Sequence, residues 1–164
     1  WRILRAPWNQ PRGSEVDELE SKAFPIMVCE VDGIPIGVGR VHFNSDTEAQ
    51  IRSMAVEEDW RGKGIGSMVV KELEKIAIDK GAKKIVLHAR DNAVKFYERN
   101  GYKVVKSSHT LFGSIPHYLM EKKMQWHTDD ADFADQRRSE NKTNVELIGI
   151  EPTTCSLRTN RSPN

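Results

Sequence analysis

Hydrophobic and polar residues follow a β-strand pattern over the first part of the chain. Two β-rich runs, PIMVCEV (residues 25–31) and IPIGVGRVHF (34–43), flank the dipeptide Asp32-Gly33. This dipeptide is the strongest short hairpin signal, because both positions of a tight two-residue turn need positive φ. A third β-rich run, AQIRSMAV, covers residues 49–56. We therefore expect three consecutive strands, the first two joined as a hairpin.

The pattern then changes to a helical period. Between residues 64 and 80, apolar residues recur at spacings of three and four, and Gly81 follows at the natural stop of a helix. The apolar positions are Ile65, Met68, Val69, Leu73, Ile76 and Ala77. This spacing predicts an amphipathic helix with one buried stripe.

The remaining apolar segments are shorter and alternate between the two patterns. We expect a strand over 83–89 (KKIVLHA), a short helix over 92–100 (NAVKFYERN), and strands over 102–107 (YKVVKS) and 115–124 (IPHYLMEKKM). The residues before Phe24 indicate a helix and a loop around WNQPRGSE, where Pro and Gly interrupt any regular pattern.

Composition divides the 164-residue chain near residue 125. This length suits one domain with a tail, so we expect a domain over 1–125 and a polar tail over 126–164. The stretch from His127 to Asn144 is polar and mixed in charge, and the last twenty residues regain a few apolar side chains without a sustained period. We expect this tail to be irregular or disordered.

Charge and cysteine content narrow the class of protein. The 25 Lys and Arg residues nearly balance the 24 Asp and Glu residues, which argues against a nucleic acid or an anionic membrane as partner. Cys29 and Cys155 have neither metal-binding nor redox spacing. There is no apolar run near 18 residues and no signal-peptide pattern, although the chain begins at Trp1 instead of Met. These features favour a cytoplasmic protein.

The first candidate binding site along the chain is the stretch WRGKGIGSMVV, residues 60–70. Three glycines stand at alternate positions among the cations Arg61 and Lys63, between a predicted strand and a predicted helix. The backbone N–H groups at a helix N-terminus have no helical partners and carry the positive end of the helix dipole. Glycine lets an oxygen approach them closely. The stretch therefore predicts a phosphate-binding loop.

Other nucleotide and metal sites fit the sequence less well. A P-loop needs Lys and then Ser or Thr after its last glycine, whereas Gly66 is followed by Ser67. A dinucleotide fingerprint would use Gly62, Gly64 and Ser67 with Asp91 on the ribose, but its third small residue is Ser and only one βαβ unit is present. No HExxH, GxSxG or clustered metal-ligand pattern occurs, so we expect no metal.

Two blocks of sequence resemble a known family. MAVEEDWRGKGIGSMVVKELEKIA (54–77), followed by FYERNGYKVV (96–105), is similar to the acetyl-CoA-binding core of the GNAT acetyltransferase superfamily, over roughly Phe24 to Met124. The resemblance implies an α/β fold with a mixed central sheet, flanked by helices and splayed between the strands at 49–56 and 84–89. The first strand of the family fold is not evident ahead of Trp1.

The resemblance also implies which residues bind acetyl-CoA. Main-chain groups of Met54, Ala55 and Val56 would pair with the pantetheine arm and the acetyl carbonyl. The pyrophosphate would be held by the amides of Arg61, Gly62, Lys63, Gly64, Ile65 and Gly66. Arg90 stands where the family often has Asn, and Asn92 is two residues out of register; we assign Arg90 to a phosphate contact.

Catalytic residues follow from the same resemblance. Tyr97 would donate a proton to the leaving thiolate of coenzyme A; the alternative is a tyrosine that packs one face of its short helix and only touches the cofactor. Phe96 belongs to the core. Amine attack requires a neutral amine and hence a proton acceptor. We assign His117, where the last strand begins; a purely structural histidine is the alternative. The other histidines are His42, His88, His109 and His127, and we expect the strand that carries His88 to be covered on both faces.

These observations give one main hypothesis and two alternatives. The main hypothesis is an N-acetyltransferase that moves the acetyl group of acetyl-CoA directly to a primary amine of a small molecule or peptide. The first alternative is a non-catalytic acyl-CoA-binding regulatory module on the same fold. The second is a dinucleotide oxidoreductase. The sequence leaves open whether the protein forms a homodimer.

Overall fold

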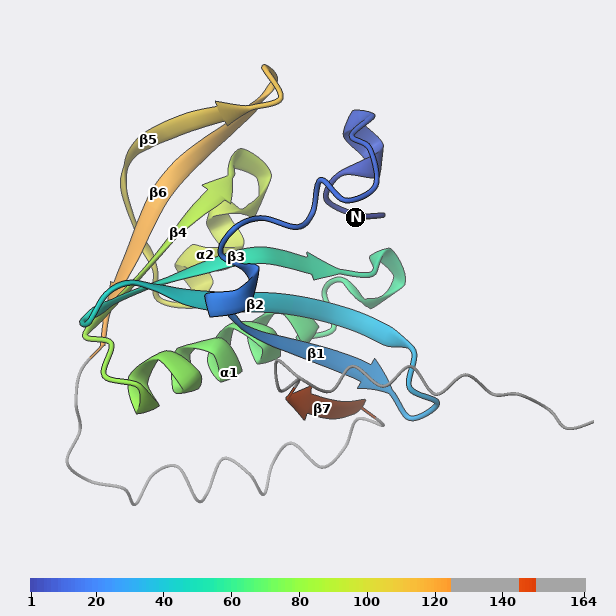
Figure 1. The fold of residues 1–164 in the computed structure, drawn as a ribbon, viewed down its shortest axis with the longest axis horizontal. Coiled ribbons are helices and arrows are strands. Elements are labelled where there is room, and N and C mark those ends of the chain that lie inside the picture. The colour runs from blue at the N-terminus through green and yellow to red at the C-terminus, as the bar shows by residue number, and fades with distance from the viewer. Residues whose placement is uncertain (125–144, 150–164) are drawn as a thin grey trace, which may run out of the picture.

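The computed structural model describes residues 1–124 and 145–149. Its strands form a seven-stranded sheet in the order β5-β6-β4-β3-β2-β1-β7 (Figure 1). The strands are β1 (Phe24–Glu30), β2 (Pro35–Ser45), β3 (Glu48–Val56), β4 (Lys84–Arg90), β5 (Lys103–Leu111), β6 (Ile115–Lys123) and β7 (Val145–Gly149). Only β3 and β4 are parallel neighbours. The predicted mixed α/β fold is confirmed.

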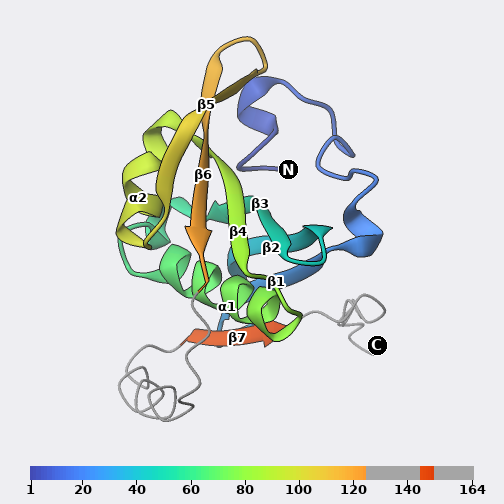
Figure 2. The same ribbon diagram turned by 90° about the vertical axis from the view of Figure 1, so that its left-hand side faces the viewer.

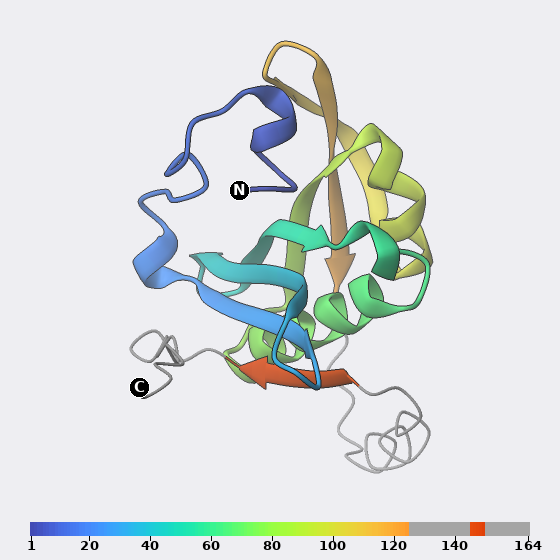
Figure 3. The same cartoon turned by 90° about the vertical axis from the view of Figure 1, so that its right-hand side faces the viewer.

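Helices lie on one side of this sheet and the N-terminal segment, residues 1–22, on the other (Figure 3). The helices are α1 (Ile65–Asp79) and α2 (Val94–Arg99), and the short 3-10 turns are η1 (Ala6–Trp8), η2 (Glu20–Lys22), η3 (Glu58–Trp60) and η4 (Asp91–Ala93). The helix expected before β1 is reduced to the two turns η1 and η2. In the described residues no helix is both long and apolar enough to cross a bilayer.

Helix α1 packs unusually close to β2. Gly37 and Gly39 face it, and a Cβ on Gly37 would lie 2.6 Å from Ile65 Cγ2. A Cβ on Gly39 would lie 2.8 Å from Val69 Cγ1 and 2.9 Å from Leu73 Cδ1. Glycine in a strand interior is typical of such a close approach. The buried stripe of α1 therefore packs directly against the backbone of β2 at Gly37 and Gly39.

The two central strands separate after a short parallel ladder. Pairing between β3 and β4 runs only from Glu48↔Lys84 to Ile51↔Leu87. Ser53, with φ 55°, lies at an irregularity in the β2–β3 register, and a bulge of this kind bends the strand that carries it. The predicted splay is thus present, and its walls are the C-terminal halves of β3 and β4.

Two expectations need correction. The β1–β2 hairpin forms, but only Gly33 has positive φ (83°), and Glu30 N–H donates to Ile34 O (2.9 Å), so the turn is longer than two residues. Within the tail, β7 pairs antiparallel with β1. The expectation of irregular structure is therefore wrong over Val145–Gly149, while residues 125–144 and 150–164, with His127 and Cys155, lie outside the described residues.

Candidate functional site

The glycine loop, residues 61–67, follows η3 and opens α1. Gly62 and Gly64 have φ values of 77° and 87°, in the left-handed region that favours glycine. No heavy atom lies within 4 Å of a Cβ built on either residue. The loop is therefore shaped by glycine, and the space beside its backbone is open.

The loop presents a run of unpaired backbone donors. Arg61 N–H donates to Glu58 O (3.1 Å), and the next such bond is Met68 N–H to Gly64 O (3.0 Å). In the described part of the chain, the N–H groups from Gly62 to Ser67 have no acceptor. This run of free amides begins and ends one residue later than the predicted set, because the Arg61 amide is paired and the Ser67 amide is not. Six donors at the positive end of α1 suit a diphosphate.

The two cations of the glycine loop, Arg61 and Lys63, lie at its surface. Arg61 is exposed and its Nε donates to Val56 O (3.3 Å). Lys63 Nζ lies 4.8 Å from the centroid of the Trp60 ring, and Trp60 Nε1 donates to Glu30 Oε1 (3.1 Å). Both cations therefore border the loop, with Arg61 on a carbonyl at the end of β3 and Lys63 over the Trp60 ring.

Residues Met54, Ala55 and Val56 form the wall of the splay on β3. One edge of this segment pairs with β2, through Ala55↔Val38 and Val56↔Gly37. Its other edge faces away from β2, and the ladder to β4 has already ended at Ile51. An extended, amide-containing chain can pair with an open strand edge as an added strand does. The three predicted residues are thus placed where such a chain would lie.

Tyr97 is buried in α2, close to the start of α1. Its ring makes edge-to-face contacts with Phe96 (centroids 4.9 Å apart) and Tyr102 (5.9 Å). A Cβ on Gly66 would lie 3.0 Å from Phe96 Cζ, so α2 packs directly against the glycine loop. Burial raises the pKa of Tyr97 to about 12. The hydroxyl is therefore protonated at neutral pH, and it has no hydrogen-bond partner among the described residues.

His117 lies on the opposite face of the sheet, as the cross-strand partner of Arg90. The ring is buried, and its Nδ1 lies 2.9 Å from Ile115 O. Because a carbonyl only accepts, Nδ1 carries the proton, and Nε2 of the neutral ring is left as an acceptor with no partner among the described residues. Burial lowers the pKa of His117, and the charges of His109 and Arg90 lower it further. The imidazole is thus neutral at pH 7.

Two further histidines surround His117, and sequence reasoning did not group them. His109 stacks on His117 with centroids 4.8 Å apart, and His88 lies 5.2 Å from His109. Ser108 Oγ joins them, at 2.7 Å from His88 Nδ1 and 3.2 Å from His109 Nδ1. His88 is only half-buried, although we expected its strand to be covered on both faces. Within the described ranges, no three His, Cys, Asp or Glu side chains are arranged to hold a metal ion.

Arg90 is not part of the phosphate cradle. Its Nη2 donates to Leu4 O (3.3 Å), and its guanidinium lies 5.9 Å from the centroid of the Trp8 ring. Strand alternation puts Arg90 on the face that carries His88 and His117, away from α1. The predicted phosphate contact is therefore replaced by contacts with the N-terminal segment.

Comparisons with known proteins agree with this architecture. The model of the Acetyltransferase (GNAT) family matches residues 1–102. The uncharacterized N-acetyltransferase YjcF of Bacillus subtilis (strain 168) is 36% identical over 114 residues, which cover 70% of this chain and 80% of that protein.

Two solved structures have the same fold. An aminoglycoside 6'-N-acetyltransferase complexed with coenzyme A superimposes with a TM-score of 0.66 at 20% identity, over 78% of this chain and 90% of that one. A GNAT family acetyltransferase from Elizabethkingia anophelis with acetyl-CoA bound gives 0.52 at 17% identity, over 57% and 71%.

The chain belongs to the acetyltransferase (GNAT) family. The predicted family, the splayed sheet and the enzyme class, an acetyl-CoA-dependent N-acetyltransferase, are confirmed. The acceptor is not identified by these comparisons.

Proposed function

We propose that this protein transfers the acetyl group of acetyl-CoA directly to a primary amine while both substrates are bound. The observation that carries the proposal is the splay between β3 and β4. On the α1 face it has a run of backbone N–H groups without acceptors, and on the other face it has a neutral imidazole with a free nitrogen lone pair. The two substrates would enter from opposite faces. They would meet in the gap between the strands.

Acetyl-CoA would be held along the α1 face. The amides from Gly62 to Ser67 would bind the diphosphate, with Arg61 and Lys63 adding charge at the loop. The open edge at Met54–Val56 would pair with the amides of the pantetheine arm. Both solved relatives described above contain coenzyme A or acetyl-CoA, which supports the assignment of the ligand.

Proton transfer would use one residue on each face. The amine nitrogen attacks the thioester carbon and the C–S bond breaks, so one proton leaves nitrogen and one is needed at sulfur. His117 Nε2 would accept the proton from the amine, and the protonated hydroxyl of Tyr97 would donate to the sulfur. Each group has the protonation state its role requires at neutral pH.

The proposal is tested by measuring thiol release from acetyl-CoA with a broad panel of amines. Tyr97→Phe should lower turnover by about 10²-fold, because positioned proton transfer contributes at least this much. Its affinity for acetyl-CoA, measured by calorimetry, should be nearly unchanged. Tyr102→Phe is the matched control, since it removes a hydroxyl from the neighbouring ring.

Two results would contradict the proposal in different ways. Equal turnover in Tyr97→Phe and the wild type would remove Tyr97 from the mechanism. Tight binding of acetyl-CoA without thiol release for any amine would favour the alternative of a non-catalytic binding module.

A further inference from the structure

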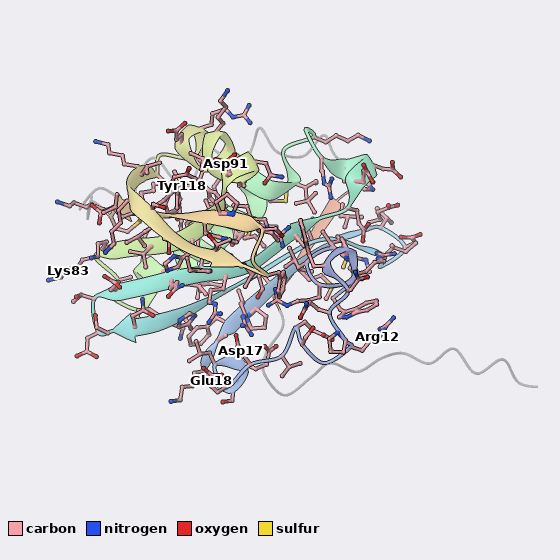
Figure 4. The ribbon with its side chains drawn as sticks, turned by 90° about the horizontal axis from the view of Figure 1, so that it is seen from above. Arg12, Asp17, Glu18, Lys83, Asp91 and Tyr118 are labelled. Carbon is pink, nitrogen blue, oxygen red and sulfur yellow. The ribbon has the colours of Figure 1, made fainter. Side chains whose placement is uncertain are left out.

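The sheet face opposite α1, which we call the acceptor face, carries two arginines that have acidic partners. Arg40 pairs with Asp17 and Glu20, and Arg52 Nη1 lies 3.5 Å from Asp17 Oδ2. Burial alone would raise the pKa of Asp17, but the charge and hydrogen bond of Arg40 lower it. Figure 4 labels Asp17 where the N-terminal segment runs beside the strands.

Arg5 and Arg90 differ from this neutralised pair. Among the described residues neither makes an ion pair with a carboxylate, although both are half-buried. Burial lowers the pKa of Arg90, and the charge of Arg5 lowers it further, so the two guanidiniums repel each other. Arg90 nevertheless stays protonated, because arginine keeps its charge in proteins. A bound anion would relieve this repulsion.

Both guanidiniums are held in place by main-chain carbonyls. Arg5 Nε donates to Ser14 O (3.1 Å), and Arg90 Nη2 donates to Leu4 O (3.3 Å). The other N–H groups of the two side chains have no described acceptor. Guanidinium groups with free N–H donors are suited to carboxylate and phosphate oxygens.

An aromatic pair supports the two arginines. The Trp8 and Phe112 rings are stacked, with centroids 6.5 Å apart, and the Arg5 guanidinium lies 5.8 Å from the Phe112 centroid. Phe112 has a φ of 52°, which is rare for a bulky residue, in the turn between β5 and β6. Figure 2 shows this turn beside the N-terminal segment. The two segments together hold both cations in one place.

We propose that Arg5 and Arg90 bind an acidic group, carboxylate or phosphate, carried by the amine acceptor. The proposal rests on the proposed acetyl transfer, since it assigns the acceptor of that reaction. Arg90 is the cross-strand partner of His117, so an acid group held by Arg90 lies beside the assigned proton acceptor. The acceptor class is thus a small amine that also carries an anion.

The same charges disfavour polycationic acceptors. An aminoglycoside or a polyamine would bring additional ammonium groups next to Arg5, Arg90 and the imidazole cluster. An acceptor with one amine and one anion avoids this repulsion. The nearby cations also favour the neutral form of its amine, which is the nucleophilic form.

The first test compares matched acceptors in the acetyl-CoA turnover assay. The pairs are an amino acid and its amide, and an amino sugar and its phosphate ester, with spermidine as the polycation. The anionic member of at least one pair should have kcat/KM at least about tenfold higher, and the preferred pair distinguishes carboxylate from phosphate. A preference for the neutral members or for spermidine would overturn the proposal.

The second test removes the arginines one at a time. Arg90→Gln and Arg5→Gln should each raise KM for the anionic acceptor by about 10- to 100-fold, with a much smaller change for its neutral analogue. Arg12→Gln is the control, since Arg12 is exposed at the outer side of the same segment, 4.5 Å from the Trp1 centroid (Figure 4). Loss of affinity for both members of a pair alike would contradict an anion contact.

A binding experiment separates this proposal from the proposed reaction. Inorganic phosphate is titrated calorimetrically into protein saturated with acetyl-CoA, which occupies the glycine loop. Binding should be detected in the wild type and in Arg12→Gln and lost in Arg90→Gln and Arg5→Gln. Equal binding in all four, or none in the wild type, would refute the anion site even if acetyl transfer is active. Failure of acetyl-CoA itself to bind would refute the proposed function instead.

Discussion

The two faces of the central sheet are built by different means. The α1 face is apolar, and glycines shape it. Gly37 and Gly39 have no side chains, which lets α1 pack close to β2, and the glycine loop exposes its backbone amides. The opposite face depends on long polar side chains, with arginines and histidines from β2, β3, β4 and β6 beneath the N-terminal segment. The α1 face therefore offers a ligand main-chain donors, whereas the opposite face offers charged and titratable side chains.

The largest expected effect is on kcat, and it comes from substitution of His117 on the face opposite α1. His117→Gln should lower kcat by about 10²-fold, because it removes the group that we propose as the proton acceptor. If His117 has this role, kcat/KM of the wild type should fall as the pH drops through the lowered pKa of His117, because a protonated ring cannot take the proton of the amine. Steady-state rates across pH test both points. His109→Gln, at the exposed stacking partner, is the control and should cost less than about tenfold.

On the α1 face, Gly39→Ala tests the close helix packing. The new Cβ would meet Met54 Sδ at 2.6 Å as well as two side chains of α1. Overpacking of this kind should lower the free energy of unfolding by about 1–3 kcal/mol, measured by urea denaturation. Gly37→Ala should behave similarly. Unchanged stability in both variants would mean that α1 does not rest on glycine.

A smaller effect is expected when the cradle alone is altered. Gly64→Ala places a Cβ in the open space beside the loop at a φ of 87°, and should weaken acetyl-CoA binding about tenfold. Gly33→Ala is matched for conformation, with φ 83° and open space, but lies in the β1–β2 hairpin. Calorimetric titration of both should separate ligand contact from backbone strain. Equal weakening in both would assign the effect to strain.

The smallest effect concerns the stability of the polar face in acid. Burial lowers the pKa of His42, His88 and His117 below the ordinary value of 6.5. As the pH falls below this value, the unfolded chain binds protons that the folded chain does not, so stability is lost. The melting temperature should therefore decrease between pH 7.5 and 5.5. His42→Gln should reduce this dependence, and a higher melting temperature in acid would contradict it.

The two faces also differed in how far the sequence predicted them. The glycine loop and α1 were predictable because their geometry is local: glycines with positive φ and the helical period lie within a single segment. Gly37 and Gly39 carried a usable signal as glycines inside a strand pattern, but not the identity of their contact.

The acceptor face was not predictable from spacing. The stacked rings of His109 and His117 come from two strands, and Arg90 meets Arg5 and Trp8 across more than eighty residues of chain. Such contacts arise only when the sheet and the N-terminal segment are assembled. This is why the sequence suggested a phosphate contact for Arg90 and not its contacts with Leu4 and Trp8.

We propose that acetyl-CoA binds on the α1 face of the sheet and the amine on the opposite face. The most direct test is an NMR titration of the ¹⁵N-labelled protein with acetyl-CoA. The account predicts the largest amide shifts from Gly62 to Ser67 and along Met54–Val56, with little change at Arg5. Unchanged amides from Gly62 to Ser67 at saturation, or the largest shifts at Arg5 and the N-terminal segment, would contradict it.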